Sequence, residues 1–151
     1  MSLYQSVSRR GFLGASIFFT LSSSNARAQE QVLTFSELYE SFGVMGLSFS
    51  ARAKSLKGMR VAMSGYMAPP LKAESPFFVL TREPIAICPF CQSDADWPID
   101  IVVVYLNDTT PLLASGAKLV VTGTLELGSW VDPESGFVSQ VRLRGSRFRR
   151  V

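Results

Sequence analysis

The pattern of apolar and polar positions after residue 58 is typical of β-strands. Five stretches either alternate apolar with polar residues or are rich in β-branched residues, and turn-forming residues separate them. The predicted strands cover residues 59–67, 77–81, 99–106, 119–127 and 138–148. The third is nearly all apolar, which favours a strand buried on both faces. Gly123 interrupts the fourth and predicts a bulge or a barrel corner there.

Before residue 58 the spacing of apolar residues indicates helices instead. Phe35, Leu38, Tyr39 and Phe42 follow the three-and-four spacing of an amphipathic helix over residues 33–42, with Thr34 or Ser36 as its N-cap. Residues 48–56 contain good helix formers and predict a second short helical turn. The whole pattern predicts a mostly β fold, a small five-stranded OB-like Greek-key barrel with an N-terminal helix. An open β-sandwich and an α+β roll are the alternatives.

Residues 1–28 have the three parts of an export signal. The pair Arg9-Arg10, followed by Phe12-Leu13, resembles the twin-arginine consensus, and Ala26-Arg27-Ala28 is a small-x-small cleavage site. The apolar run between them is well short of the roughly 20 residues that span a bilayer, so no permanent membrane span is expected. We therefore expect the twin-arginine export machinery to deliver residues 29–151, as one domain, to the periplasm. A general secretory signal is the alternative.

The number and position of charged residues limit which ligands are expected. The chain has 15 basic and 12 acidic residues. Three of the arginines and none of the acids fall in the signal, so the exported domain has 12 of each and nucleic-acid binding is not indicated. Five arginines still gather at the C-terminus, where they suit phosphate, anionic lipid or a solvated strand face: Arg142, Arg144, Arg147, Arg149 and Arg150. The chain contains no histidine, the commonest general base and metal ligand.

The order of these segments resembles a known group of proteins. Gly65-Tyr66-Met67-Ala68-Pro69, a cysteine-containing loop, the valine run 101–104 and residues 120–125 are similar to a group of exported bacterial OB-like domains of uncharacterised function. The resemblance extends over most of residues 58–148. Members often lie beside metal-ion transporter components, which implies an accessory role in metal handling and an envelope or transporter protein as partner. The group's loop pairs one cysteine with a histidine, so chemistry through that histidine does not carry over to this chain.

The loop in this chain reads Cys88-Pro89-Phe90-Cys91, and three interpretations compete. In an oxidising compartment the two cysteines form a disulfide that fixes the loop. As two thiolates they hold a soft metal ion, zinc or copper, with Asp94 or Asp96, or with Met63 or Met67. In the third interpretation the protein is a thiol-disulfide redox enzyme with Cys88 as nucleophile and Cys91 as resolving thiol. The short, turn-rich segment before Pro98 argues against the long helix that redox chemistry uses.

Two further groups of residues carry weaker signals. Trp130 with Glu126, Asp132 and Glu134 suits either a sugar site or a plain polar turn. Five aromatic residues suit either a stacking face for single-stranded nucleic acid or core packing: Tyr66, Phe77, Phe78, Phe137 and Phe148. We expect a non-enzymatic binding or accessory domain that binds no nucleic acid. A thiol redox enzyme, and an envelope-complex subunit that docks through residues 33–42, are the alternatives.

Overall fold

The computed structural model of the chain describes residues 30–43, 46–69, 77–85, 97–107 and 114–151. The predicted signal residues and the loop residues Cys88, Cys91, Asp94 and Asp96 lie outside these ranges, so what was predicted for them stays a prediction. The described residues are mostly β, with eight strands, one short α-helix and one 3-10 turn. The predicted β class is therefore confirmed.

The N-terminal segment differs from its prediction. It consists of β1 (Gln31–Val32), the 3-10 turn η1 (Phe35–Glu37), β2 (Tyr39–Gly43), β3 (Gly46–Phe49) and α1 (Ala51–Leu56). The amphipathic helix expected over residues 33–42 is wrong, whereas the short helix expected within residues 48–56 is confirmed as α1. Ser50 caps α1, where its hydroxyl accepts a hydrogen bond from the Ala53 N–H at 3.0 Å.

Local and tertiary contacts explain why the helix does not form. The backbone N–H and the hydroxyl of Thr34 donate to the Glu37 carboxylate at 2.9 and 2.7 Å, which closes a single turn and lowers the pKa of Glu37. The chain then enters an antiparallel hairpin in which β2 pairs with β3 and Gly43 lies opposite Gly46. Pairing between strands satisfies the backbone as a helix would, so the apolar spacing alone did not decide the structure.

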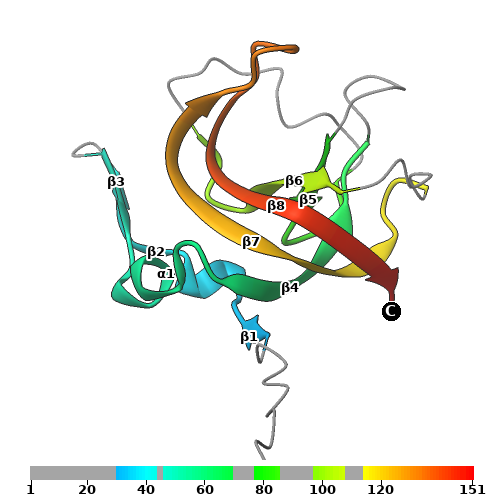
Figure 1. The fold of residues 1–151 in the computed structure, drawn as a ribbon, viewed down its shortest axis with the longest axis horizontal. Coiled ribbons are helices and arrows are strands. Elements are labelled where there is room, and N and C mark those ends of the chain that lie inside the picture. The colour runs from blue at the N-terminus through cyan, green and yellow to red at the C-terminus, as the bar shows by residue number, and fades with distance from the viewer. Residues whose placement is uncertain (1–29, 44–45, 70–76, 86–96, 108–113) are drawn as a thin grey trace, which may run out of the picture.

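All five predicted strands are confirmed. They are β4 (Arg60–Met67), β5 (Phe77–Thr81), β6 (Ile101–Leu106), β7 (Lys118–Val131) and β8 (Val138–Arg150). Antiparallel pairs join β4 to β5, β5 to β6, β8 to β7 and β7 to β4, and a parallel pair joins β6 to β8. The pairings thus return to the strand where they began, and β1 adds to β4 in parallel to complete a six-stranded mixed sheet (Figure 1).

Two glycines allow the strands to approach one another closely. At Gly123 the register of β7 against β8 shifts, which confirms the predicted bulge. A Cβ at this position would collide with the Ser146 hydroxyl and lie 3.0 Å from the Leu143 Cβ. A Cβ at Gly65 would lie 2.6 Å from the backbone oxygen of Thr81, on the neighbouring β5. A side chain at either position would force the strands apart.

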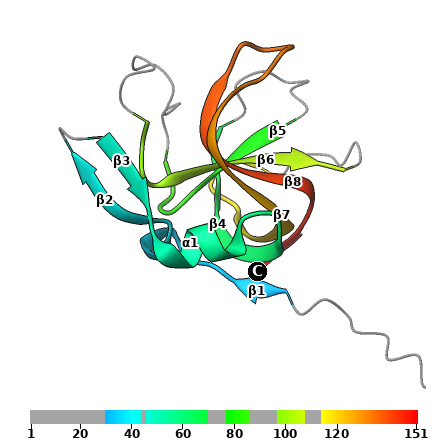
Figure 2. The ribbon, with the colours of Figure 1, turned by 60° about the vertical axis from the view of Figure 1, so that its left-hand side comes forward.

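The main core lies inside this circuit of strands. Alternate residues of β4, β7 and β8 are buried there with Phe78, Leu80, Val102 and Val104 of β5 and β6. Leu33, Phe35 and Leu38 of the N-terminal segment join the same cluster, so these three side chains are not exposed for the docking that the envelope-subunit alternative assigned to residues 33–42. The β2–β3 hairpin projects from the six-stranded sheet and leaves Phe42 65% exposed (Figures 1 and 2).

Candidate functional site

The outer face of β5 and β6 is apolar and is covered by other parts of the chain. Phe77, Val103 and Tyr105 form one buried cluster on it, against which Trp97, Trp130 and Phe137 pack. Ala68, Val79 and Ile101 form a second cluster, against which Ile85 and Trp97 pack. Both faces of these strands are therefore buried, as the apolar sequence of the third predicted strand indicated. Trp97 contributes to both clusters.

Four of the five aromatic residues considered for nucleic-acid stacking pack in or against the apolar clusters, and Tyr66 is the exception. Phe77 and Phe78 are each 2% exposed. The ring of Phe77 packs at 5.4 Å from Phe137, and the ring of Phe78 packs edge-on at 5.6 Å from Phe148. Tyr66 is partly exposed beneath the ammonium of Lys118, which lies 5.9 Å from its ring centre. Core packing, the simpler of the two interpretations, accounts for Phe77 and Phe78.

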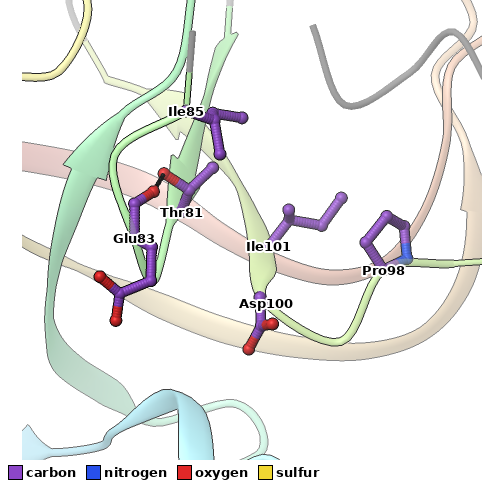
Figure 3. Close-up of a pocket in the computed structure, with 6 residues that line it drawn as sticks. All are labelled: Thr81, Glu83, Ile85, Pro98, Asp100 and Ile101. Carbon is purple, nitrogen blue, oxygen red and sulfur yellow. Dashed lines mark hydrogen bonds between the residues drawn. The ribbon is translucent and has the colours of Figure 1, made fainter. Parts of the chain in front are cut away.

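A small cavity of about 190 Å³ lies where the connection between β5 and β6 leaves one strand and enters the next. It is lined by Thr81, Glu83, Ile85, Pro98, Asp100 and Ile101 (Figure 3). The two carboxylates point to one side of the cavity in that view, and the two isoleucines and the proline form its apolar part. Both ends of the connection that contains Cys88 and Cys91 thus contribute to one cavity.

Hydrogen bonds hold the two ends of this connection together. The Arg82 N–H donates to the Asp100 backbone oxygen at 3.0 Å, and the two side chains form an exposed ion pair at 3.5 Å. Thr81 is 2% exposed, and its hydroxyl donates to the backbone oxygen of Glu83 at 2.7 Å. An exposed ion pair stabilises little, so the buried hydroxyl and the backbone pair are the firmer restraints. They fix the backbone at Glu83 and Asp100, from which the two carboxylates project.

Trp97 connects this region to the projecting hairpin. Its indole N–H donates to the Tyr39 hydroxyl at 2.8 Å, and the Tyr39 ring stacks on Phe49 at 5.5 Å. Burial raises the pKa of Tyr39 to about 12, although the hydrogen bond from Trp97 acts in the opposite direction. Tyr39 is therefore a neutral hydroxyl at physiological pH. Trp97 was not singled out from the sequence, where its signal was that of a large aromatic residue within a polar, turn-rich segment.

A second polar cluster lies where β7 and β8 extend beyond the circuit. Arg142 is 5% exposed and donates to the Glu126 carboxylate at 3.0 Å and to the backbone oxygens of Gly128 and Ser139 at 2.8 and 3.0 Å. The Arg144 guanidinium lies 4.1 Å from the centre of the Trp130 ring and 4.2 Å from that of Tyr105, and it donates to Glu126 at 3.3 Å. Burial opposes ionisation of Glu126, but the two arginines hold its pKa below the ordinary value.

Asp132 closes the turn between these strands. Its carboxylate is buried and accepts hydrogen bonds from the Tyr105 hydroxyl at 2.9 Å and from the Ser135 N–H and hydroxyl, each at 2.8 Å. Burial alone would raise the pKa of Asp132, but the hydrogen bonds from Ser135 and Tyr105 lower it. These are the contacts of a polar turn, and they occupy the carboxylate that a sugar site would need.

The comparisons with known proteins bear on the fold. No protein-family model and no curated protein matches the chain. One solved structure matches well. The chain is similar in fold to a DUF3299 family protein from Pseudomonas aeruginosa PAO1, with a TM-score of 0.56 over 81% of this chain and 96% of that one. At 15% identity the likeness shows a shared fold. It agrees with the resemblance to an uncharacterised group and carries no residue roles.

Two of the predicted metal ligands, Met63 and Met67, lie in the core. Met63 and Met67 are at most 1% exposed within the main core, where packing accounts for them. Among the described residues, no three histidine, cysteine, aspartate or glutamate side chains gather closely enough to hold a metal ion. No helix in the described part of the chain is long and apolar enough to cross a membrane. Glu83 and Asp100, at the cavity, were not singled out from the sequence.

Proposed function

We propose that this protein is an exported, periplasmic binding or accessory domain, built on a five-stranded OB-like Greek-key barrel, that acts through the connection between β5 and β6. The observation that carries the proposal is the circuit of strand pairings. Its strands follow the order β4, β5, β6, β8, β7 and back to β4, with a parallel pair between β6 and β8. A closed Greek-key order of five strands is the arrangement of an OB-like barrel.

The usual binding face of such barrels is closed in this chain. OB-folds bind oligonucleotides and oligosaccharides on the face of their second and third strands, which here correspond to β5 and β6. That face carries Val79, Val103 and Tyr105, each at most 7% exposed, beneath Trp97 and Phe137. Its closure supports a domain that binds no nucleic acid on this face. Binding is instead assigned to a loop, where functional residues of rigid scaffolds are commonly found.

The connection between β5 and β6 is the best candidate loop. It is long for a link between paired antiparallel strands, and loops of such length within compact domains are commonly functional. It contains Cys88 and Cys91, the chain's only cysteines. At its two ends Glu83 and Asp100 place carboxylates beside one cavity. We propose that the cysteines form either a disulfide or a soft-metal site for zinc or copper, with Asp94 or Asp96 as further ligands, and that the domain takes part in metal-ion handling beside an envelope or transporter protein.

The alternative function is a thiol-disulfide redox protein that uses Cys88 as nucleophile. Redox motifs of this kind sit at the N-terminus of a helix, where the dipole lowers the thiol pKa. The segment from Cys91 to Pro98 is short and rich in turn-forming residues, which argues against such a helix and favours the binding domain.

The test is the state of Cys88 and Cys91 in protein isolated from its native cell envelope. Intact mass before and after thiol alkylation, combined with elemental analysis, measures disulfide, metal content and the N-terminal residue together. We expect no alkylation until a reductant or a chelator is added, and a chain that begins at Gln29. A Cys88→Ser/Cys91→Ser variant is the matched control for metal content. Free thiols that alkylate rapidly, with a Cys88 pKa well below about 8.5, would replace the proposal with the redox alternative.

A further inference from the structure

The outer side of β4, β7 and β8 carries a set of exposed basic residues from three separate strands. We call this set the basic face, and it consists of Arg60, Lys118, Arg147 and Arg149. Figure 1 shows the three strands side by side. Tyr66 of β4 lies opposite Lys118, and Arg60 lies opposite Thr124 of β7. Thr122 and Val120 of β7 lie opposite Arg147 and Arg149. Directly opposed residues point to the same side of a sheet, so the four basic side chains share one side.

The charges of the basic face are largely uncompensated. The ion pairs among the described residues are those of Arg82 with Asp100 and of Arg142 and Arg144 with Glu126, and none involves the basic face. Two carboxylates of the described residues reach this side. Glu126 follows Thr124 along β7, but it is paired with Arg142 and Arg144. Glu30 accepts a hydrogen bond from the Thr122 hydroxyl at 3.3 Å. In the described part of the chain, the four cations therefore share the surface with one carboxylate that is not already in an ion pair, that of Glu30.

We propose that the basic face docks on an anionic phospholipid surface. Most side chains between its cations are small, namely Ala62, Ser64, Val120, Thr122 and Thr124. Among these paired positions the one aromatic residue is Tyr66, which is partly exposed beneath the ammonium of Lys118. A single tyrosine is not the cluster of aromatic anchors that dominates protein interfaces and that stacks the bases of single-stranded nucleic acid. What it offers is positive charge, and an anionic membrane attracts each nearby lysine or arginine by about 1 kcal/mol. The field of that membrane reaches about 8 Å at physiological ionic strength, so a curved sheet face need not touch the lipid at every cation.

We prefer a membrane to a duplex polynucleotide as the occupant because we propose that the protein is exported. The existence of the positive face does not depend on that proposal. The inference is independent of the chemistry of Cys88 and Cys91. The experiment below can therefore fail while the cysteine experiment succeeds, and the reverse also holds.

The experiment is co-sedimentation of the full-length protein with vesicles of phosphatidylglycerol, with phosphatidylcholine vesicles as the neutral comparison. The variants are Arg147→Gln/Arg149→Gln, Glu30→Gln and, as a matched control outside the face, Lys54→Gln/Lys57→Gln. Residues 1–28 are the same in every variant, so differences between variants report the face and not the export signal. Circular dichroism and thermal unfolding establish that each variant is folded.

We expect binding to phosphatidylglycerol that weakens at 0.5 M salt and little binding to phosphatidylcholine. Removing two charges at about 1 kcal/mol each should reduce the partition coefficient about 30-fold, and Glu30→Gln should raise it about fivefold. The control variant should bind as the parent protein does. Equal binding by the arginine variant and the control would overturn the proposal. So would displacement of the protein from the vesicles by duplex DNA at matched phosphate concentration, which would identify a polynucleotide as the occupant. If the arginine variant does not fold, an unchanged affinity of Glu30→Gln refutes the inference by itself.

Discussion

Replacing Arg142 with methionine should destabilise the protein much more than the same change at Arg144, two residues along β8. Both guanidiniums donate to Glu126, but their surroundings differ. The side chain of Arg142 is 6% exposed, and that of Arg144 is 32% exposed. Arg142 also supplies the hydrogen bonds to the backbone oxygens of Gly128 and Ser139. Methionine keeps most of the apolar stem at either position, so the comparison isolates the guanidinium.

The expected magnitudes follow from these contacts. Removing one partner of a buried charged network costs about 3–5 kcal/mol, because the groups left behind are buried without a donor. Glu126 is 40% exposed and regains water, so Arg142→Met should fall near the lower end of that range, at about 3 kcal/mol. Arg144→Met loses a partly exposed ion pair worth up to about 1 kcal/mol and contacts with two aromatic rings worth about 0.5–1 kcal/mol each at exposed sites. These contributions sum to about 1–3 kcal/mol, and because methionine keeps favourable contacts with the two rings the net cost should be about 1–2 kcal/mol.

Urea unfolding followed by circular dichroism measures both free energies of unfolding, provided the slope with denaturant is unchanged. The double variant should show non-additive effects, since the two arginines share Glu126. The reasoning is refuted if Arg142→Met costs no more than Arg144→Met, because the buried guanidinium would then contribute no more than a surface pair.

Two further predictions test the close strand contact and the buried turn. Gly65→Ala should lower the free energy of unfolding by about 1–3 kcal/mol, because its Cβ would lie 2.6 Å from the Thr81 backbone oxygen. Urea titrations measure this loss, with Ser64→Ala as the neighbouring control. An equal loss in the control would contradict the steric argument. Asp132 has a folded pKa below its ordinary value of 3.8. Its contribution to stability is therefore complete above about pH 4 and is lost as the pH falls through the folded pKa, since the unfolded chain then binds more protons. Between pH 6 and pH 3 the urea midpoint of Asp132→Asn should fall less steeply than that of the parent protein, and parallel curves would be the contrary result.

Local patterns in the sequence were enough to predict the five main strands. Alternation of apolar and polar residues and runs of β-branched residues are local properties, and they act in the same way in any tertiary setting. The valine run of β6 indicated a strand buried on both faces, and Gly123 marked the bulge in β7. Both features depend on the residues' own shape: branched side chains pack on a pleated sheet, and only glycine permits the close approach of Ser146.

Tertiary structure decided the features that depend on contacts between distant segments. Residues 33–42 have the spacing of a helix, but pairing with β3 and burial of Leu33 and Leu38 against the strands of the six-stranded sheet stabilise a turn and a hairpin instead. Arg142 alternates with buried residues as a solvated side chain would, yet Gly128 and Ser139 enclose it because β7 and β8 extend beyond the circuit. The basic face likewise unites cations from three strands through their register. No short stretch of sequence predicts such contacts, because they join distant segments and their free energy is gained only when the whole chain has folded.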